Sequence, residues 1–272
     1  MDVACWHPAA VSCDPVHLLH CNEVSGYDRG EPRMPKHERG YCEARPPSRL
    51  MRKSQEAAKE QLRRANPEQP RVLAYGDSLT AGYVPCKQCC VQEREGCKTC
   101  RRTPWITVLG RMLQMDVHHK GCEGWTTAMH VHALEEGGLR SLLADAELEG
   151  NPYGIVLIMS GGNDLADGES AVTIVQNLVT LHKEAHSFGA RTVALGIPES
   201  RGWAEEADLG KRGAAANEQL SKLSWSDSDD QGICLFVSAP LCYSTEPIWY
   251  SDGLHLTAEG YNEFGKRLAT NP

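Results

Sequence analysis

The stretch Val72-Leu73-Ala74-Tyr75-Gly76-Asp77-Ser78-Leu79-Thr80 joins a short apolar run to a glycine and two polar residues. Four consecutive apolar residues ahead of a glycine are typical of a buried strand, so we expect Ser78 at the turn where that strand ends. A serine hydroxyl is a weak nucleophile at neutral pH and needs a base that a third group orients. Ser78 is therefore a candidate nucleophile, although a serine at this place also suits a helix N-cap.

A candidate base and a carboxylate to orient it lie near the C-terminus, in Ser251-Asp252-Gly253-Leu254-His255. Asp252 and His255 are three residues apart, close enough for the carboxylate to accept a hydrogen bond from the imidazole. The other ring nitrogen can then face Ser78. Taken by themselves, the two residues also suit a solvated turn with a surface histidine, and their occurrence together with Ser78 favours catalysis.

Donors for a developing oxyanion occur between these two segments. The run Gly161-Gly162-Asn163-Asp164 follows the strongest strand signal of the chain, at residues 154–160. We therefore expect the Asn163 amide at the same edge of the sheet as Ser78. Gly124 can offer a backbone N–H that no side chain blocks. Asn163 equally suits a turn, because asparagine tolerates positive φ.

With these segments, the chain resembles the SGNH hydrolases, the superfamily of GDSL-type esterases and lipases, over about residues 70–272. Four blocks of that family occur in its order, and together they are far more specific than any one of them. The matching residues are Gly76, Asp77, Ser78 and Leu79; Gly124; Gly161, Asn163 and Asp164; Asp252 and His255.

The resemblance implies a catalytic triad and an oxyanion hole. Ser78, Asp252 and His255 would be catalytic, and Ser78, Gly124 and Asn163 would bind the oxyanion. Asp77 and Asp164 would hold loops rather than react. We expect hydrolysis of a small-molecule carboxylic ester without a required cofactor, while thioesters, acetylated sugars and lipids stay open as substrates because shared catalytic residues do not set specificity.

The alternation of strand and helix signals from residue 71 onward predicts an α/β fold. Strands are expected at 72–75, 115–118, 154–160, 192–197 and 233–237. Helices are expected after Thr103-Pro104, from about Thr127, around 175–182, at 214–223 and at the C-terminus. The first of these is expected to have Thr103 as its N-cap and Pro104 as its first residue, and to bury Trp105, Val108, Leu109 and Met112. We expect a three-layer, flavodoxin-like parallel sheet with helices on both faces and the site at the carboxyl ends of the strands.

The first 69 residues differ from the rest of the chain. Residues 1–47 show no sustained apolar period, which favours disorder, and residues 48–65 are rich in helix formers, which predicts a short exposed helix. We therefore expect an N-terminal extension at 1–69, largely disordered, and a hydrolase domain at 70–272.

A cysteine-rich insertion at residues 86–100 separates the serine motif from the first long helix. Cys86 and Cys89 form one Cys-x-x-Cys pair, Cys97 and Cys100 form another, and Cys90 is left over. Four thiolates suit a structural zinc and leave no open position for catalysis. Disulfides, which need an oxidising compartment, and free thiols are the alternatives.

The composition agrees with a soluble enzyme, and we expect it in the cytoplasm because neither a secretory signal nor a membrane span is evident. The net charge of −8 gives no electrostatic case for nucleic acid. No apolar run approaches the roughly 18 residues that span a bilayer, and the N-terminus lacks the pattern of a secretory signal. The oligomeric state is not predicted. A non-catalytic, zinc-stabilised interaction module is the alternative from another class, and the intact Ser78, Asp252 and His255 argue against it.

Overall fold

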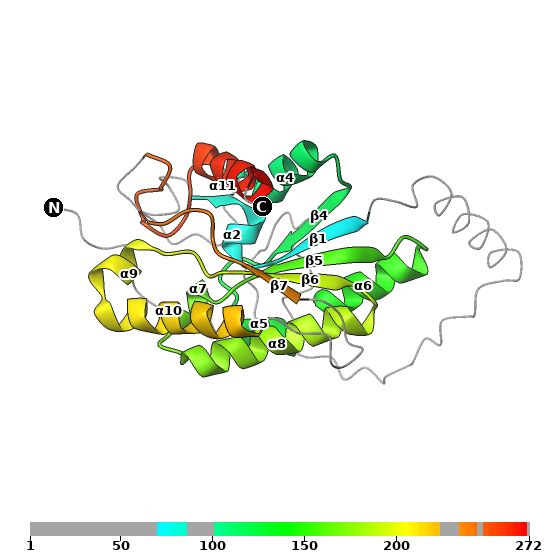
Figure 1. Cartoon of the computed structure of the whole chain (residues 1–272), viewed down its shortest axis with the longest axis horizontal. Coiled ribbons are helices and arrows are strands. Elements are labelled where there is room, and N and C mark those ends of the chain that lie inside the picture. Colours follow the sequence, from blue (N-terminus) through cyan, green and yellow to red (C-terminus); the bar gives the residue numbers. More distant parts are fainter. Residues whose placement is uncertain (1–69, 86–100, 224–233, 244–246, 271–272) are drawn as a thin grey trace, which may run out of the picture.

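The computed structural model describes residues 70–85, 101–223, 234–243 and 247–270. The extension at 1–69, with its predicted helix, and the cysteine insertion at 86–100 lie outside these residues. The described part forms three layers, in which a central sheet lies between two sets of helices (Figure 1).

The central sheet has five strands in the order β4-β1-β5-β6-β7, and every neighbouring pair is parallel. The strands are β1 (Arg71–Gly76), β4 (Val117–Gly121), β5 (Tyr153–Met159), β6 (Arg191–Leu195) and β7 (Cys234–Val237). Numbered among themselves along the chain, they follow the order 2-1-3-4-5 of a flavodoxin-like fold. The predicted fold class is thus confirmed.

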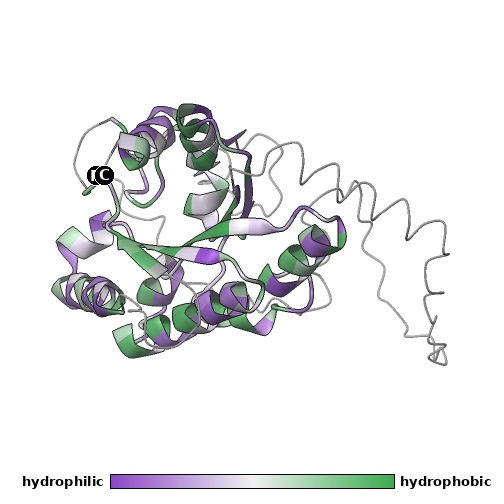
Figure 2. Cartoon of the chain, turned by 45° about the vertical axis from the view of Figure 1, so that its right-hand side comes forward, coloured by the Kyte–Doolittle hydropathy of each residue, from purple (hydrophilic) through white to green (hydrophobic). Residues whose placement is uncertain are grey.

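Helices cover both faces of this sheet (Figures 1 and 2). Four of its strands are mostly apolar, whereas β4, at one edge, carries His118, His119 and Lys120. One face carries α4 (Trp105–Leu113) and α11 (Ala258–Thr270). The other carries α5 (Thr127–His132), α6 (Leu139–Leu148), α8 (Ala171–Ser187) and α10 (Ala207–Lys222). The chain also forms the short helices α2 (Ser78–Ala81), α7 (Gly162–Ala166) and α9 (Arg201–Glu205).

The core between the sheet and the α4/α11 pair is built around large aromatic side chains. The Trp105 and Phe264 rings lie 5.4 Å apart, and both side chains are buried. Gly265 permits this close packing, because a Cβ at this position would lie 2.4 Å from the Trp105 carbonyl oxygen. Burying each such aromatic side chain stabilises the fold by roughly 1.5–3 kcal/mol. The contact between these two rings therefore holds α4 and α11 together on this face of the sheet.

The structure corrects several predicted boundaries around α4. Pro104 is the N-cap of this helix rather than its first residue. Met112 is 44 % exposed rather than buried, because α4 ends one residue later and its last turn carries Met112 away from the core. The next strand begins at Val117 instead of residue 115, since the backbone first reverses at Gln114, which has a φ of 55°.

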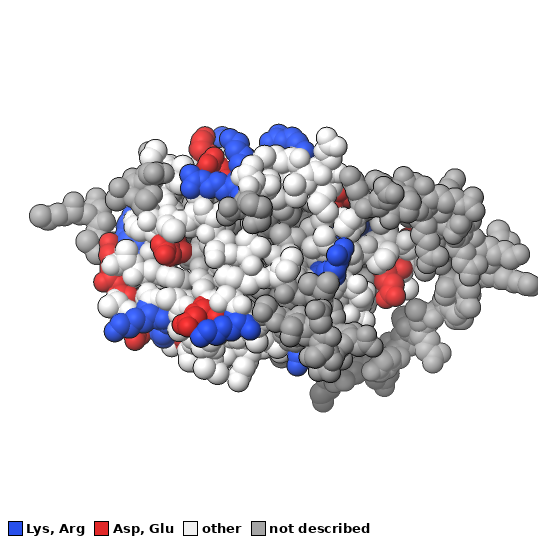
Figure 3. Space-filling view, in the orientation of Figure 1, with Lys and Arg blue, Asp and Glu red and all other residues white. Residues whose placement is uncertain are grey.

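Charged side chains of both signs are interleaved over the helices at the upper and lower edges of Figure 3. Several of them form ion pairs one helical turn apart, including Arg212 with Asp208 in α10 and Arg267 with Glu263 in α11. Such exposed pairs contribute only about 0.3–0.5 kcal/mol each. Within the described ranges, no helix is both long and apolar enough to cross a membrane.

A small second sheet projects from the connection between α2 and α4. Its two antiparallel strands are β2 (Tyr83–Val84) and β3 (Arg101–Arg102), and residues 86–100 run between them outside the described part. We call this pair the β2–β3 ribbon.

Candidate active site

Ser78 lies at the turn between β1 and α2, as the sequence predicts. It is the first residue of α2, and Asp77 is the N-cap, whose side chain accepts the Leu79 N–H at 3.0 Å. Ser78 itself is therefore not an N-cap. The turn needs glycine at position 76, because a Cβ there would lie 1.9 Å from the Met159 carbonyl oxygen of the neighbouring strand.

The structure brings Ser78, His255 and Asp252 into one chain of hydrogen bonds. Ser78 Oγ lies 2.9 Å from His255 Nε2, across 177 residues of sequence. His255 Nδ1 lies 2.8 Å from Asp252 Oδ2. The imidazole thus bridges a hydroxyl and a carboxylate, the arrangement in which a histidine can take a proton from serine.

The segment that carries the acid and the base is a tight turn held mostly by its own atoms; we call it the Asp252 turn (residues 251–255). Asp252 Oδ1 accepts the backbone N–H groups of Leu254 and His255, both at 2.9 Å. Burial alone would raise the pKa of Asp252, but hydrogen bonding with His255, its positive charge and these two N–H groups hold that pKa below its ordinary value. Asp252 is therefore ionised at neutral pH.

Arg201, which the sequence analysis missed, supports the Asp252 turn from α9. Its backbone N–H donates to the Gly253 carbonyl at 2.7 Å, and its guanidinium donates to the Ser251 carbonyl at 2.9 Å and to the Tyr243 hydroxyl at 3.1 Å. Gly253 has a φ of 71°, and a Cβ there would lie 2.5 Å from Arg201 Cβ. No short motif could reveal this contact, because it joins segments about 50 residues apart.

The two loops predicted to supply oxyanion donors leave the strands on either side of β1. Gly76, at the end of β1, is paired with Gly121 of β4 and Met159 of β5. The glycine loop (residues 122–126) follows β4, and Gly124 has a φ of 75° there. Asn163 follows β5 at the start of α7. Both predicted donors therefore lie at the sheet edge where Ser78 lies.

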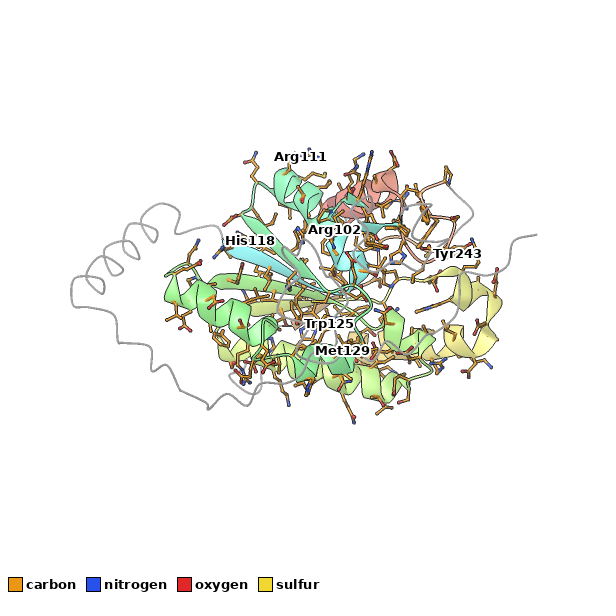
Figure 4. The ribbon with its side chains drawn as sticks, turned by 180° about the vertical axis from the view of Figure 1, so that it is seen from behind. Arg102, Arg111, His118, Trp125, Met129 and Tyr243 are labelled. Carbon is orange, nitrogen blue, oxygen red and sulfur yellow. The ribbon has the colours of Figure 1, made fainter. Side chains whose placement is uncertain are left out.

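A hydrogen bond joins the two loops. Asn163 Nδ2 donates to the Trp125 carbonyl oxygen at 2.8 Å. Figure 4 shows Trp125 on the glycine loop, with Met129 of α5 beneath it. Because a side-chain amide has two N–H donors, this bond orients Asn163 and leaves its second N–H for another acceptor.

A clamp of three residues, Asp164, Thr127 and Asn177, fixes the same two loops, and the first two are buried. The sequence analysis found only Asp164. Both carboxylate oxygens of Asp164 accept the Thr127 N–H, at 3.0 and 2.8 Å, and the Thr127 hydroxyl donates to Asp164 Oδ1. Asn177 of α8 donates to that hydroxyl at 3.0 Å. Burial raises the pKa of Asp164, and the hydrogen bonds from Thr127 oppose this shift. Thr126-Thr127 resembles an ordinary helix start, and nothing in the sequence marks Asn177.

Asp77 is a buried carboxylate between the two parts of the site. It is 3 % exposed, and burial raises its pKa to about 7, although the Leu79 N–H and the charge of His255 favour its ionised form. The charge of Asp164 raises that pKa further. Asp77 thus caps the N-terminus of α2, although burial of its negative charge is unfavourable.

An apolar cavity lies next to Ser78 and His255, on the side of α4 and α11. Its walls include Leu79 and Leu256, which directly follow Ser78 and His255, together with Trp105 and Trp249. Within the described ranges, no group of three or more His, Cys, Asp or Glu residues could hold a metal ion. The four cysteines predicted to bind zinc lie outside those ranges, so that prediction stays a prediction.

Comparison with known proteins agrees with this geometry. The model of the GDSL-like lipase/acylhydrolase family matches residues 74–262, which is more than half of the chain. The chain therefore belongs to that family, whose activity is the hydrolysis of ester or acyl bonds. A comparison with curated protein sequences finds no match.

Solved structures share the fold at low sequence identity. A protein described as lipolytic and of the G-D-S-L family, from Desulfitobacterium hafniense DCB-2, superposes with a TM-score of 0.54 at 17 % identity, covering 74 % of this chain and 99 % of its own. The lipase Lip_vut3 from a goat rumen metagenome gives 0.53 at 14 %, covering 74 % and 97 %. The psychrotrophic esterase EstA from Pseudoalteromonas sp. gives 0.52 at 18 %, covering 74 % and 96 %.

Proposed function

We propose that this protein is a serine hydrolase that cleaves carboxylic esters through an acyl-enzyme on Ser78. The observation that carries the proposal is the continuous chain from Ser78 Oγ to His255 Nε2 at 2.9 Å and from His255 Nδ1 to Asp252 Oδ2 at 2.8 Å. Membership of the GDSL-like lipase/acylhydrolase family supports the same reaction class. The substrate is a small-molecule ester, and the residues need no cofactor for this chemistry.

In the first step, His255 takes the proton of the Ser78 hydroxyl while Oγ attacks the ester carbonyl carbon. Asp252 accepts a hydrogen bond from the Nδ1–H of His255, so that Nε2 carries no hydrogen and can receive the proton of Ser78. The depressed pKa of Asp252 keeps its negative charge beside the imidazolium that forms. The carboxylate therefore stabilises the charge separation of the transition state.

The carbonyl oxygen becomes negatively charged as Oγ adds to the carbon. The backbone N–H groups of Ser78 and Gly124 and the second N–H of Asn163 donate to it. His255 then protonates the departing alcohol, which leaves an acyl group on Ser78. In the second step, His255 takes a proton from water while the water oxygen attacks the acyl carbon. The bond between that carbon and Ser78 Oγ then breaks, His255 returns the proton to Oγ, and the carboxylic acid leaves.

Labelling with a fluorophosphonate tests the proposal, because such a probe reacts with a serine only when its hydroxyl is activated. We expect stoichiometric labelling of the wild type at Ser78 and none of Ser78→Ala, together with loss of ester hydrolysis. The structure of EstA inhibited by monoethylphosphonate supports the choice of probe.

The matched control for this experiment is Ser221→Ala, since Ser221 is an exposed residue of α10 that bonds only within its helix. This variant should be labelled like the wild type. Undiminished labelling or turnover in a folded Ser78→Ala protein would refute the proposal.

A further inference from the structure

The β2–β3 ribbon lies between the serine helix and α4 and touches the site at two separate places. It begins directly after α2, because Gly82 ends that helix with a φ of 67°. The Gly82 carbonyl then accepts the Thr103 N–H at 2.8 Å, which closes the base of the ribbon. A Cβ on Gly82 would lie 2.3 Å from Thr103 backbone atoms, so only glycine permits this closure. The ribbon is thus tied to the helix that carries Ser78.

The first contact is between Tyr83 and His255. Their ring centroids are 5.1 Å apart, and the ring planes meet at 71°. This edge-to-face arrangement is favourable for two aromatic rings and restricts how each can turn. His255 is already held by hydrogen bonds at both of its nitrogens, which lie in the plane of its ring. The tyrosine adds a contact that opposes tilting of that plane.

Tyr83 is itself fixed from the core. The hydroxyl of Tyr261, a fully buried residue of α11, donates to the Tyr83 carbonyl oxygen at 2.9 Å. This bond joins α11 to the ribbon across 178 residues of sequence. The buried Tyr261 therefore holds the backbone of Tyr83, from which the ring reaches His255.

The second contact is between Arg102 and the glycine loop. Arg102 Nε and Nη2 lie 2.9 and 2.8 Å from the same oxygen of Glu123, which directly precedes Gly124. In Figure 4, Arg102 lies on the ribbon above Trp125 of that loop. Tyr83 and Arg102 face each other in the ribbon register. One ribbon therefore touches the turn that carries the base and the loop that carries an oxyanion donor.

We propose that the β2–β3 ribbon positions both halves of the active site: Tyr83 is a positioning residue for the His255 imidazole, and Arg102 is a positioning residue for the glycine loop through Glu123. This inference rests on the proposed serine hydrolase function. Neither residue needs to touch the substrate, because each acts through the group that it holds. No motif of the sequence marks either of them.

The two contacts differ in expected strength. The tyrosine contact is partly buried and aromatic, and such pairs change an equilibrium by about two- to tenfold. The Arg102 and Glu123 side chains are 61 % and 35 % exposed, so water and salt weaken their attraction. Loss of the Tyr83 contact should therefore lower kcat more than loss of the Arg102 contact.

Steady-state kinetics of Tyr83→Ala and Tyr83→Phe test the first contact, with a chromogenic short-chain ester as substrate. We expect kcat to fall about tenfold in Tyr83→Ala with KM nearly unchanged, because the base loses its orientation while the substrate contacts stay. Tyr83→Phe should keep kcat within about twofold, since the ring and not the hydroxyl makes the contact. Arg101→Ala, an exposed neighbour on the same ribbon, is the matched control and should behave as the wild type.

Several outcomes would overturn the role of Tyr83. A rise in KM at constant kcat would show that Tyr83 contacts the substrate. Equal losses of kcat in Tyr83→Ala and Tyr83→Phe would assign the effect to its hydroxyl. Wild-type kinetics in Tyr83→Ala would also end the proposal. Tyr83→Leu replaces Tyr83→Ala if the latter does not fold. Because Ser78→Ala is measured beside them, a wild type without Ser78-dependent hydrolysis would instead reject the proposed function.

A double-mutant cycle tests the second contact. We expect Arg102→Gln and Glu123→Gln each to lower kcat by about two- to threefold, and the double variant to be no worse than either single variant. The effect should shrink in 0.5 M salt, since the pair is exposed. Losses that multiply in the double variant, or the absence of any loss, would show that Arg102 does not act through Glu123.

Discussion

The two halves of the proposed active site are held in different ways. On the base side, Asp252 and His255 are three residues apart, and the carboxylate binds the backbone of its own turn as well as the imidazole. On the oxyanion side, Asn163 reaches Trp125 across 38 residues. The clamp behind it joins Thr127 to Asp164 across 37 residues and to Asn177 across 50.

This difference teaches that the same site contains one part built from local geometry and another built from packing. The Asp252 side chain bonds within its own turn, and Arg201 supports the same turn through backbone carbonyls. A change of the Asp252 charge alone should therefore reduce catalysis and leave the shape of the turn. The oxyanion side depends on three segments meeting at one edge of the sheet. Substitutions on the oxyanion side should therefore lower activity by shifting the proposed oxyanion donors, even where the substituted residue contacts no reacting atom. The predictions below separate these two effects.

The largest effect is expected for Asp252→Asn. The amide oxygen can still accept the N–H groups of Leu254 and His255, so the turn should persist, but the amide cannot hold the imidazole in the useful tautomer or stabilise its positive charge. We expect kcat to fall by about 10⁴ and the thermal midpoint to fall only slightly, because the variant loses the attraction between the Asp252 charge and His255. Asp208→Asn, on the exposed face of α10, is the control. A large loss of stability would show that the base side is not locally held.

Asn163→Ala should have the next largest effect. It removes one oxyanion donor and also the bond to Trp125. We expect a loss of about 3 kcal/mol of transition-state stabilisation, seen in kcat rather than in KM. Asn262→Ala in α11 is the matched control. If the loss appeared only in KM, Asn163 would bind the ground state of the substrate instead.

Thr127→Val tests the clamp without touching a proposed catalytic residue. Valine keeps the branched shape and the backbone donor but removes the hydroxyl that joins Asp164 to Asn177. We expect a loss of about 1–2 kcal/mol in the free energy of unfolding and a drop of about tenfold in kcat. Thr180→Val, whose hydroxyl is exposed on α8, should change neither. Loss of stability at full kcat would make the clamp structural only.

The smallest effect is expected for Asp77, which interacts with the charges of His255 on the base side and Asp164 on the oxyanion side. Its pKa is raised to about 7 in the folded state from an ordinary value of 3.8, so the folded protein binds more protons than the unfolded one between these pH values. Stability from this group is complete below about pH 4 and is lost as the pH rises through 7. Asparagine removes this dependence and can still accept the Leu79 N–H.

Thermal unfolding of Asp77→Asn at pH 5 and pH 8 measures this effect. We expect the variant to gain about 1 kcal/mol over the wild type at pH 8, or about 3 °C in the midpoint, and less at pH 5. Asp145→Asn, on α6 and away from the site, is the control. A larger gain at pH 5 than at pH 8 would contradict the raised pKa of Asp77.

The sequence alone determined the fold class and the residues of the proposed triad. Apolar runs at 72–75 and 154–160 are typical of buried strands, because a strand covered on both faces needs hydrophobic side chains on both sides. Asp252 and His255 were recognisable because their contact depends on a spacing of three residues. Gly124 and Asn163 followed from the rule that loops after neighbouring parallel strands meet at one edge.

Only the tertiary structure decided how these residues are held. Thr127, Asn177, Arg201 and Tyr83 are ordinary residues in the sequence, and they acquire their contacts because strands and helices far apart in the chain pack together. The exposure of Met112 was equally invisible, since helical spacing gives the apolar side of a helix but not where the covering sheet ends. A contact between residues three positions apart can be predicted from the sequence. The contacts that hold the site residues, and the exposure of side chains such as Met112, depend on which distant segments pack together in the folded protein.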